Sequence, residues 1–371
     1  MDFLLMLIIY CILFIVGTLC VLYRDAQLLN SGPIGVLKDF VIETFNRLIP
    51  QSLQNGCFNL CEYLLYRRNS FFQLIFAVLL LLAHAVWVVD MLPILYHHYP
   101  AHNHTFWPFV AVFVNYYCWH KAWTGDPGTI TMKSVNKYMQ VYQYDNVLYE
   151  SGKKCSTCQL PKPARSKHCS ICNRCVHRFD HHCIWTNNCV GGLNHRYFIL
   201  FMATLLAMFM QGIYVGTGCI LDFAHETRLF KASFRDDDGQ IMPITVSIAF
   251  QHLFMALPRL VFLVIAVIVL TILVGIFFCH HLYLIFTNQT TNERHKLQEF
   301  KYQMDQSNST YQSETIDWSR QSKCDKHSGN RSNDKRNVLH SNCRPYSRGI
   351  LNNFLEVFLP HKFIHSRIKQ N

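Results

Sequence analysis

Long apolar stretches limit the folds open to this chain. Hydrophobic residues make up 51% of it and charged residues only 15%, which is well below the charged fraction of a soluble domain. A bilayer core of about 30 Å is crossed by roughly 20 apolar residues in a helix. The sequence therefore predicts an all-α polytopic membrane protein with five transmembrane helices, at residues 3–23, 71–92, 106–123, 197–221 and 260–286.

The first apolar stretch, residues 3–23, has an alternative interpretation as a cleaved signal peptide. Such a peptide has a basic leader and a shorter apolar core, whereas this stretch follows Asp2 and is uncharged along its length. We therefore expect it to remain in the chain as the first span.

Lysine and arginine in the connecting segments predict the orientation, because cytosolic loops are enriched in these residues. Residues 24–70 carry five of them, residues 124–196 carry ten and the tail 287–371 carries fourteen, whereas residues 93–105 carry none. The three basic segments are therefore expected in the cytosol. Residues 93–105 are then lumenal. Residues 222–259 carry four basic residues balanced by acidic ones and are compatible with the lumenal side, and five spans place residues 1–2 there as well.

The tail contains a stretch with little to bury. From Asp305 to about Tyr346 it is rich in serine, asparagine, glutamine and charged residues. Such a composition is typical of disordered segments, so we expect a disordered insert there.

Cysteines and histidines are concentrated in the segment that joins the third and fourth spans. Seven of the sixteen cysteines lie between Cys155 and Cys189, with four histidines among them. Disulfides would need an oxidising compartment, whereas this density is typical of metal sites. Two tetrahedral zinc sites of three cysteines and one histidine would use six cysteines and leave one. Spacing alone does not identify the spare cysteine or the two ligating histidines.

A quartet in the same segment, Asp180-His181-His182-Cys183, joins a carboxylate, imidazoles and a thiol. These are the groups needed to orient a base and deprotonate a sulfur nucleophile. Because the segment is tethered between two predicted spans, its chemistry would occur at the bilayer surface. A nucleic-acid partner is not expected, although the net charge of +11 would suit one.

Two other functions fit parts of the pattern. A membrane-tethered zinc module that only scaffolds partners would leave Cys183 dispensable. A metal transporter would explain histidines at membrane depth, but the predicted spans lack paired carboxylates or clustered ligands.

The segment resembles the cysteine-rich domain of the DHHC family of protein palmitoyltransferases, at residues 153–203. Outside it, Asp126-Pro127-Gly128, Thr290-Thr291-Asn292-Glu293 and Asn353-Phe354-Leu355-Glu356-Val357-Phe358 are similar to three further motifs of the family. Within the segment the resemblance is carried, besides the quartet, by Cys155, Lys162-Pro163, Arg165, His168-Cys169, Cys172, Cys175, Cys189, Asn194 and Phe198. The extra first span departs from the family's common four-span arrangement and is typical of one vertebrate subfamily.

The resemblance implies a small cytosolic domain that holds two structural Zn²⁺ ions with interleaved ligands. One ion would be bound by Cys155, Cys158, His168 and Cys175, and the other by Cys169, Cys172, His182 and Cys189. His177 has no role in this scheme, so we expect it to be an exposed polar residue.

The resemblance also implies the reaction. Cys183 would take a fatty acyl group, mainly palmitoyl, from acyl-CoA and pass it to cysteines of membrane-associated protein substrates. His181 would act as the base and Asp180 would orient it. Thr291 would steady Asp180, and Asn353 would seat the tail against the membrane helices.

Basic residues near the quartet have two interpretations. They could receive the phosphates of palmitoyl-CoA, or they could face anionic lipid head groups of the bilayer. These residues are Lys162, Arg165, Lys167, Arg174 and Arg178. The compartment is expected to be the endoplasmic reticulum membrane, with the Golgi or plasma membrane as alternatives, because Arg367 and Lys369 near the C-terminus weakly resemble a retrieval signal.

Overall fold

The computed structural model describes Glu43, Arg47 and residues 50–98, 106–235, 239–311 and 345–370, without the side chains of Phe234 and residues 304–311. The predicted first span, residues 3–23, lies outside the described residues. Contacts divide the chain into two units, each described here by itself. Unit 1 comprises residues 1–69, 80–102 and 212–267, and unit 2 comprises residues 70–79, 103–211 and 268–371.

Three helical runs are long and apolar enough to cross a membrane: Phe71–His97, His195–Glu226 and Pro258–Phe286. They coincide with the predicted second, fourth and fifth spans. The first run consists of α4 (Phe71–Val86), the π-helical turn η2 (Trp87–Met91) and α5 (Leu92–His98). The other two runs are α8 (His195–Glu226) and α10 (Pro258–Phe286).

The predicted third span coincides with α6 (Phe106–Thr124). Its second half carries Asn115, His120 and Lys121, and it is not among the three helices that pass on length and apolar composition. One of these polar side chains has partners on a neighbouring helix. The Asn115 amide donates to the carbonyl oxygen of Phe201 and to the hydroxyl of Thr204 on α8, at 3.1 and 2.9 Å. The described residues thus show three helices able to span, and the expected five remain a prediction.

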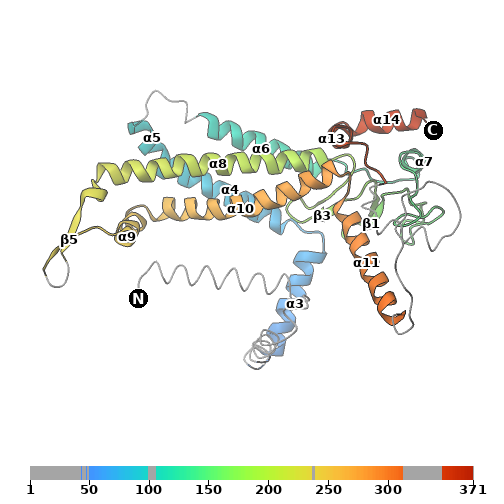
Figure 1. Ribbon diagram of the computed structural model, residues 1–371, viewed down its shortest axis with the longest axis horizontal. Helices are drawn as coiled ribbons and strands as arrows, with labels where there is room; N and C mark the ends of the chain where they lie inside the picture. The colour runs from blue at the N-terminus through green and yellow to red at the C-terminus, as the bar shows by residue number, and fades with distance from the viewer. Residues whose placement is uncertain are drawn as a thin grey trace, which may run out of the picture. The chain divides into compact units, whose positions relative to one another are not determined.

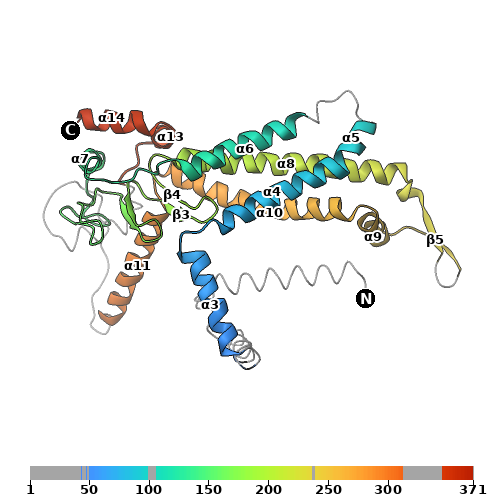
Figure 2. The same cartoon turned by 180° about the vertical axis from the view of Figure 1, so that it is seen from behind.

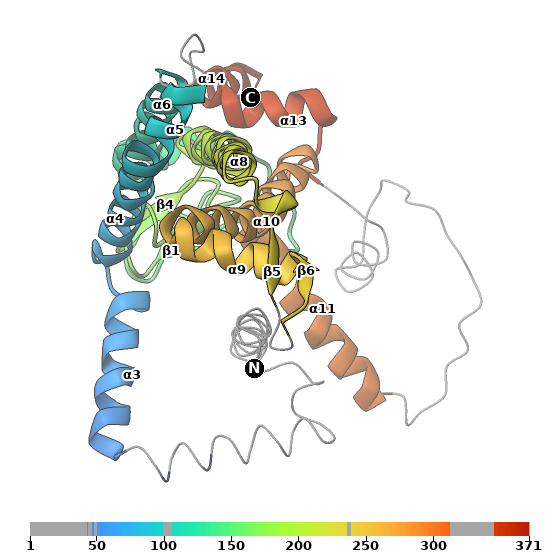
Figure 3. The same cartoon turned by 90° about the vertical axis from the view of Figure 1, so that its left-hand side faces the viewer.

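In unit 2 the helices share one apolar core. The start of α4 contributes Phe76, α6 contributes Trp119 and the first half of α8 contributes Phe201. Helix α10 lies beside α8, as Figures 1 and 3 show. The rings of Phe198 on α8 and Phe277 in the second half of α10 are in edge contact. The cysteine-rich segment packs against this core of buried aromatic and aliphatic side chains.

Two short antiparallel hairpins organise the cysteine-rich segment, so the all-α expectation is wrong at this point. The hairpins are β1 (Lys167–Cys169) with β2 (Arg174–Val176), and β3 (His181–Cys183) with β4 (Asn188–Val190). Their turns include Asn173 and Asn187 at positive φ, a conformation that asparagine tolerates. The register places His168 opposite Cys175 and His182 opposite Cys189, so each hairpin brings two predicted metal ligands together.

The Asp-Pro-Gly motif joins α6 to the first hairpin. The carboxylate of Asp126 accepts hydrogen bonds from the backbone of Gly128 and Thr129, and Gly128 has a φ of +100° that favours glycine. The backbone of this segment then pairs with β2, since Ile130 N donates to Cys175 O at 2.9 Å. A short helix, α7 (Val135–Met139), follows.

The tail is folded at both ends of the stretch expected to be disordered. Helix α11 (Thr291–Tyr311) extends past Asp305, and the ring of Tyr346 packs against the guanidinium of Arg165. The disorder prediction is wrong at these ends, and residues 312–344 lie outside the described residues. The tail ends in α13 (Ile350–Phe358) and α14 (Pro360–Gln370), drawn in red in Figures 1 and 2.

Unit 1 contains α3 (Gln51–Tyr66), the hairpin β5 (Ser233–Arg235) with β6 (Ile241–Pro243), η4 (Leu229–Lys231) and α9 (Val246–Ala256), with η2, α5 and parts of α4, α8 and α10. Its core includes Met91, Cys219 and Leu260. A Cβ on Gly216 would lie 2.5 Å from Val264, so glycine allows α8 and α10 to approach closely there.

Candidate active site and metal centres

The first cluster of ligand side chains has the dimensions of a zinc site. The ligand atoms of Cys155, Cys158, His168 and Cys175 all lie within 4.8 Å of one another. His168 Nδ1 is 3.3 Å from Cys158 Sγ and 3.8 Å from Cys175 Sγ. Tetrahedral zinc with ordinary bond lengths separates a sulfur from a nitrogen ligand by ~3.6 Å, so this donor set fits the metal.

The second cluster has the same composition and size. It consists of Cys169, Cys172, His182 and Cys189, again with all ligand atoms within 4.8 Å. His182 Nδ1 lies 3.3 to 3.9 Å from the three sulfur atoms. Four protein ligands complete a tetrahedral shell in each cluster, so both fit structural zinc rather than an ion with an open position.

Cys183 belongs to neither cluster. It ends β3 and is 7% exposed. Its side chain lies in the apolar core of unit 2, together with Trp119 of α6 and Phe198 and Met202 of α8. The thiol is therefore placed where the cysteine-rich segment meets the apolar helices.

Asp180, His181 and Thr291 form a hydrogen-bonded chain next to this thiol. His181 Nδ1 donates to Asp180 Oδ2 at 2.7 Å. Thr291, the first residue of α11, donates its backbone N–H to Asp180 Oδ1 at 2.9 Å and its hydroxyl to Oδ2 at 3.0 Å. Because three donors hold the buried carboxylate, the tautomer and the orientation of the His181 ring are fixed.

The electrostatics of the site favour an ion pair. Burial alone would raise the pKa of Asp180, but the hydrogen bond from His181 and nearby histidines outweigh burial and lower it. Burial opposes protonation of His181, yet Asp180 and Cys183 raise its pKa to about 10. Burial also opposes ionisation of Cys183, and its contact with His181 outweighs burial and lowers its pKa. A thiolate next to an imidazolium is the expected pair.

Two further histidines, His281 and His195, lie near the His181 ring, and neither was predicted from the sequence. His281 of α10 brings a ring nitrogen within 4.8 Å of the ligand atoms of Asp180 and His181. His195, at the start of α8, is fully buried, and its ring lies 6.2 Å from that of His281. His281 lies within the predicted fifth span and His195 lies two residues before the predicted fourth span, so neither belongs to the spacing pattern of the cysteine-rich segment.

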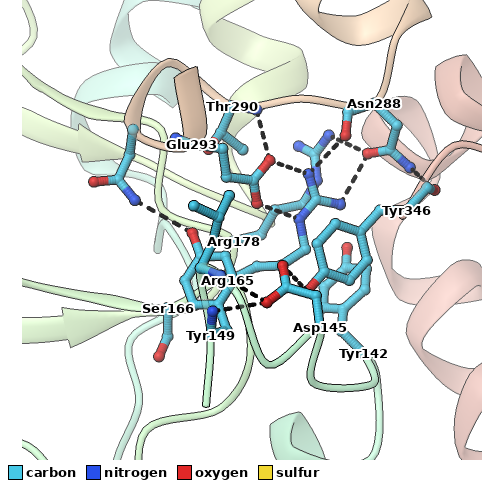
Figure 4. Close-up of polar contacts among 12 residues, drawn as sticks. Tyr142, Asp145, Tyr149, Arg165, Ser166, Arg178, Asn288, Thr290, Glu293 and Tyr346 are labelled. Atoms are coloured by element: carbon cyan, nitrogen blue, oxygen red, sulfur yellow. Dashed lines mark hydrogen bonds and ion pairs between the residues drawn. The ribbon is translucent and has the colours of Figure 1, made fainter. Parts of the chain in front are cut away.

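A buried ionic cluster is centred on Arg165, as Figure 4 shows. Arg165 is fully buried and donates to both carboxylate oxygens of Glu293, at 2.6 and 2.9 Å. Its third nitrogen donates to Asn288 Oδ1 at 2.9 Å. The rings of Tyr142 and Tyr346 flank its guanidinium, 4.9 and 4.5 Å from the ring centres. Bidentate pairing and two aromatic faces compensate for the loss of water around this charge.

The second half of the cluster comes from the tail. Glu356 of α13 pairs with Arg178 at 3.0 Å and with Arg165 at 3.4 Å. Glu356 also accepts from the Tyr142 hydroxyl at 2.6 Å and from the Asn288 amide at 2.9 Å. Two arginines and two glutamates therefore balance in charge. We use the name buried ionic cluster for Arg165, Arg178, Asn288, Glu293 and Glu356.

Two expectations about the cysteine-rich segment are wrong. Arg165 and Arg178 cannot receive phosphates or face lipid head groups, because both side chains are buried and paired with carboxylates. The expectation that His177 is exposed is also wrong. His177 is 1% exposed and its ring stacks on those of Tyr138 and Tyr142, at 4.3 and 5.4 Å between centres.

The remaining basic residues differ from one another. Lys167 is exposed and Lys162 is half-buried. Arg174 is half-buried and donates to Thr129 Oγ1 and Asn188 Oδ1, at 3.3 and 2.7 Å. Lys162 and Lys167 thus keep both interpretations open, whereas Arg174 already has partners within the segment.

Asn353 of α13 lies against the end of α10. It is fully buried, and its amide donates to the carbonyl oxygen of Phe286, the last residue of α10, at 2.8 Å. Its side-chain oxygen accepts from the backbone of Arg348 at 2.9 Å. These bonds satisfy a free carbonyl at the end of α10 and attach α13 to it.

Comparison with known proteins agrees with this geometry. The sequence profile of the DHHC palmitoyltransferase domain matches residues 148–298, a range that holds both ligand clusters, the quartet and Thr291. Palmitoyltransferase ZDHHC4 of Mus musculus is 33% identical over 297 residues, which is 80% of this chain and 85% of the relative. The chain belongs to the DHHC palmitoyltransferase family.

Further relatives in the family support the assignment. Palmitoyltransferase ZDHHC4 of Bos taurus is 35% identical over 298 residues, again 80% of this chain and 85% of the relative. Palmitoyltransferase SWF1 of Candida albicans is 55% identical over 87 residues, 24% of each chain. The expected resemblance to one vertebrate subfamily is thereby confirmed, and the subfamily is that of ZDHHC4.

Family membership makes the chain a protein S-palmitoyltransferase, as the sequence predicted, and an integral membrane protein. The ionic roles of Glu356, Arg178 and Asn288 were not predicted from the sequence. A signal existed for Glu356, because it is the single charged residue of α13.

Proposed function

We propose that Cys183 is the nucleophile that carries the acyl group, with His181 as its base and Asp180 as the residue that orients the base. The observation that carries this proposal is that six of the seven segment cysteines fall into two ligand clusters and Cys183 alone does not. It lies in the apolar core beside the Asp180–His181 pair.

The reaction has two balanced steps. The Cys183 thiolate attacks the carbonyl carbon of palmitoyl-CoA, a new carbon–sulfur bond forms, and the bond to the CoA sulfur breaks. The CoA sulfur leaves with the proton that the His181 imidazolium held. In the second step the neutral His181 takes the proton from the thiol of a substrate cysteine, whose sulfur attacks the carbonyl carbon of the acyl group. A new carbon–sulfur bond forms, the bond to Cys183 breaks, and Cys183 leaves as a thiolate next to the imidazolium. Each step exchanges one thioester for another, so neither needs ATP or a redox cofactor.

The residues around the quartet have positioning roles in this proposal. Thr291 holds Asp180 through two hydrogen bonds, and Asp180 in turn holds the Nδ1 side of His181. Asn353 attaches the tail to the end of α10. The two ligand clusters hold structural Zn²⁺, which would supply cross-links between the hairpins and their flanking loops.

Five spans with a lumenal N-terminus complete the proposal. Residues 24–70, 124–196 and 287–371 are then cytosolic, which puts the cysteine-rich domain where acyl-CoA and protein substrates with cytosolic cysteines are found. The excess of lysine and arginine in these segments supports this orientation.

The endoplasmic reticulum is the proposed compartment, ahead of the Golgi and plasma membrane. Arg367 donates to the Val141 carbonyl at 3.3 Å within unit 2, so the retrieval signal would depend on Lys369. Redistribution of a fluorescent Lys369→Ala variant to later membranes would support the signal, and unchanged distribution would remove it.

The activity is tested with purified full-length protein and labelled palmitoyl-CoA. We expect hydroxylamine-sensitive label on Cys183 and its loss in Cys183→Ser. Cys118→Ser is the matched control, because Cys118 lies in the same apolar core as Cys183 but outside the quartet. Label that persists in Cys183→Ser, in protein with its zinc retained, would assign the acyl group to another residue.

A further inference from the structure

Helix α3, drawn in dark blue in Figure 1, has two opposite faces. Leu53, Cys57, Leu60 and Leu64 recur at spacings of four, three and four residues, so they share one side of the helix. The other side carries the polar residues Gln51, Asn55, Asn59 and Glu62, together with Phe58 and Tyr66. This arrangement is typical of a helix that lies at a boundary between water and an apolar medium.

No residue of α3 is buried within the part of the chain that the structure describes. On the apolar side, Leu53 and Leu60 are each 56% exposed. The helix nevertheless ends in a defined way, because the Asn69 amide donates to the carbonyl oxygens of Tyr63 and Leu64 at 3.0 Å. A stable amphipathic helix therefore presents an apolar face to its surroundings.

Covalent connectivity indicates what covers this face. Only Arg67, Arg68, Asn69 and Ser70 separate α3 from Phe71, where the first spanning-capable run begins. Four residues reach at most ~14 Å, so the end of α3 must stay close to the bilayer surface however the units are placed. Arg67 and Arg68 suit anionic head groups. Glu62, the one acidic residue of α3, lies on the side of the helix opposite the apolar face. The lipid surface is therefore the occupant of the apolar face.

Two cysteines lie on this helix one turn apart. Cys57 is within the apolar face, between Leu53 and Leu60, and Cys61 is at its edge. Both are free thiols and exposed. A helix lying in the interface holds such side chains near the boundary of head groups and acyl chains, the level at which a fatty acyl group attached to sulfur can enter the bilayer.

We propose that Cys57, with Cys61 as the second site, is an acceptor for this chain's own acyl transfer. The Cys57 thiolate attacks the carbonyl carbon of the acyl–Cys183 thioester in the same or another copy. A carbon–sulfur bond forms at Cys57, the bond to Cys183 breaks, and the Cys183 sulfur leaves with the proton that Cys57 gave up. The attached chain then anchors α3 to the membrane.

This inference rests on the proposed acyl-enzyme, and one experiment separates the two. Full-length protein in phospholipid vesicles is stripped of acyl groups with hydroxylamine and then given labelled palmitoyl-CoA. Trypsin cleaves after Arg47 and Arg67, so a single peptide, residues 48–67, contains both cysteines. Mass spectrometry then reports label on this peptide and on Cys183 independently.

We expect label on Cys57 in the wild type and in Cys279→Ser, an exposed cysteine of α10 that serves as the control. Cys183→Ser should lose this label, whereas Cys57→Ser/Cys61→Ser should keep the label on Cys183. An unlabelled peptide beside a labelled Cys183 would overturn the inference alone. Equal label in Cys183→Ser would do so too, because transfer would then be spontaneous. Absence of label at both places would remove the proposed function as well.

A relocated cysteine tests the face assignment. Asn59→Cys in the Cys57→Ser/Cys61→Ser background puts a thiol on the polar side of the same helix. We expect it to lose the label that Cys57 carries. Equal labelling of position 59, or label on Cys61 without Cys57 in the wild type, would show that helix orientation does not select the acceptor and would overturn the proposal.

Discussion

The quartet is held by two regions that differ in how their residues are spaced along the chain. The two ligand clusters lie wholly between Cys155 and Cys189, and two hairpins bring their members together. The buried ionic cluster takes Arg165 and Arg178 from the same segment but Glu293 and Glu356 from the tail. The ligand clusters therefore form from residues that are close together in the sequence. The buried ionic cluster forms only when the tail packs against the cysteine-rich segment.

The difference also concerns which part of the site each region fixes. The ligand clusters fix β3 and β4, and thus the positions of His182 and Cys183. The buried ionic cluster acts from the tail side, because Glu293, besides binding Arg165, accepts from the backbone of Thr290 at 2.9 Å. The next residue, Thr291, holds Asp180. His181, the proposed base, is therefore oriented from the tail side, whereas Cys183, the proposed nucleophile, is positioned by the segment that holds the ligand clusters.

Loss of one metal ligand should have the largest effect, because it opens a closed shell on which the hairpins depend. Cys169→Ser is expected to abolish acylation and to release at least one zinc, since structural zinc sites contribute folding energy directly. Elemental analysis of the purified protein and the Cys183 labelling assay measure both. Cys279→Ser, which removes an exposed cysteine outside the clusters, should retain metal and activity. A Cys169→Ser protein with full zinc content would contradict the ligand assignment.

Neutralising Glu356 should have the second-largest effect, because the substitution leaves the buried Arg178 without its carboxylate partner. Breaking a buried pair costs about 3–5 kcal/mol, so Glu356→Gln should lower the thermal midpoint in detergent and slow the formation of acyl-enzyme. Zinc content should stay near that of the wild type if the two regions are separable.

The double variant Arg178→Gln/Glu356→Gln is the control for this charge argument. It restores the charge balance of the cluster, so it should be more stable than Glu356→Gln alone. A double variant that is no more stable would show that the hydrogen bonds from Tyr142 and Asn288, rather than the ion pair, account for the effect.

Removing the Thr291 hydroxyl should have a smaller effect, confined to the orientation of the base. Thr291→Val keeps the backbone N–H bond to Asp180 but loses the 3.0 Å hydroxyl bond. A hydrogen bond to a charged group contributes about 1.5–3 kcal/mol, so the rate of acyl-enzyme formation should fall about tenfold or more with zinc content unchanged. Thr291→Ser keeps the hydroxyl and should remain close to the wild type. Equal rates for valine and serine would show that the backbone bond alone is sufficient.

The same difference explains what the sequence could predict. Cys-x-x-Cys spacing and the quartet lie within one segment, so they predicted a metal domain with one spare thiol, and apolar length predicted the spanning helices. Arg165 and Arg178 appeared to be surface cations because their partners, Glu293 and Glu356, lie more than a hundred residues further along the chain. His281 was read only as part of a span, since contact between a helix and a distant strand leaves no periodic signal. The burial of His177 was not predicted because the tyrosines that stack on its ring, Tyr138 and Tyr142, precede the cysteine-rich domain at residues 153–203.

An exposed ion pair next to the first ligand cluster provides the smallest expected effect. Lys153, two residues before Cys155, has its Nζ 3.1 Å from Glu150 Oε2. The two side chains are 63% and 44% exposed. Exposed pairs contribute about 0–1 kcal/mol, so Lys153→Ala should leave the thermal midpoint, the zinc content and Cys183 labelling close to those of the wild type. The substitution removes the same kind of charge pair as Glu356→Gln but in water rather than in the protein interior. A loss comparable to that of Glu356→Gln would show that closeness to a metal ligand, and not burial, determines how much an ion pair matters in this domain.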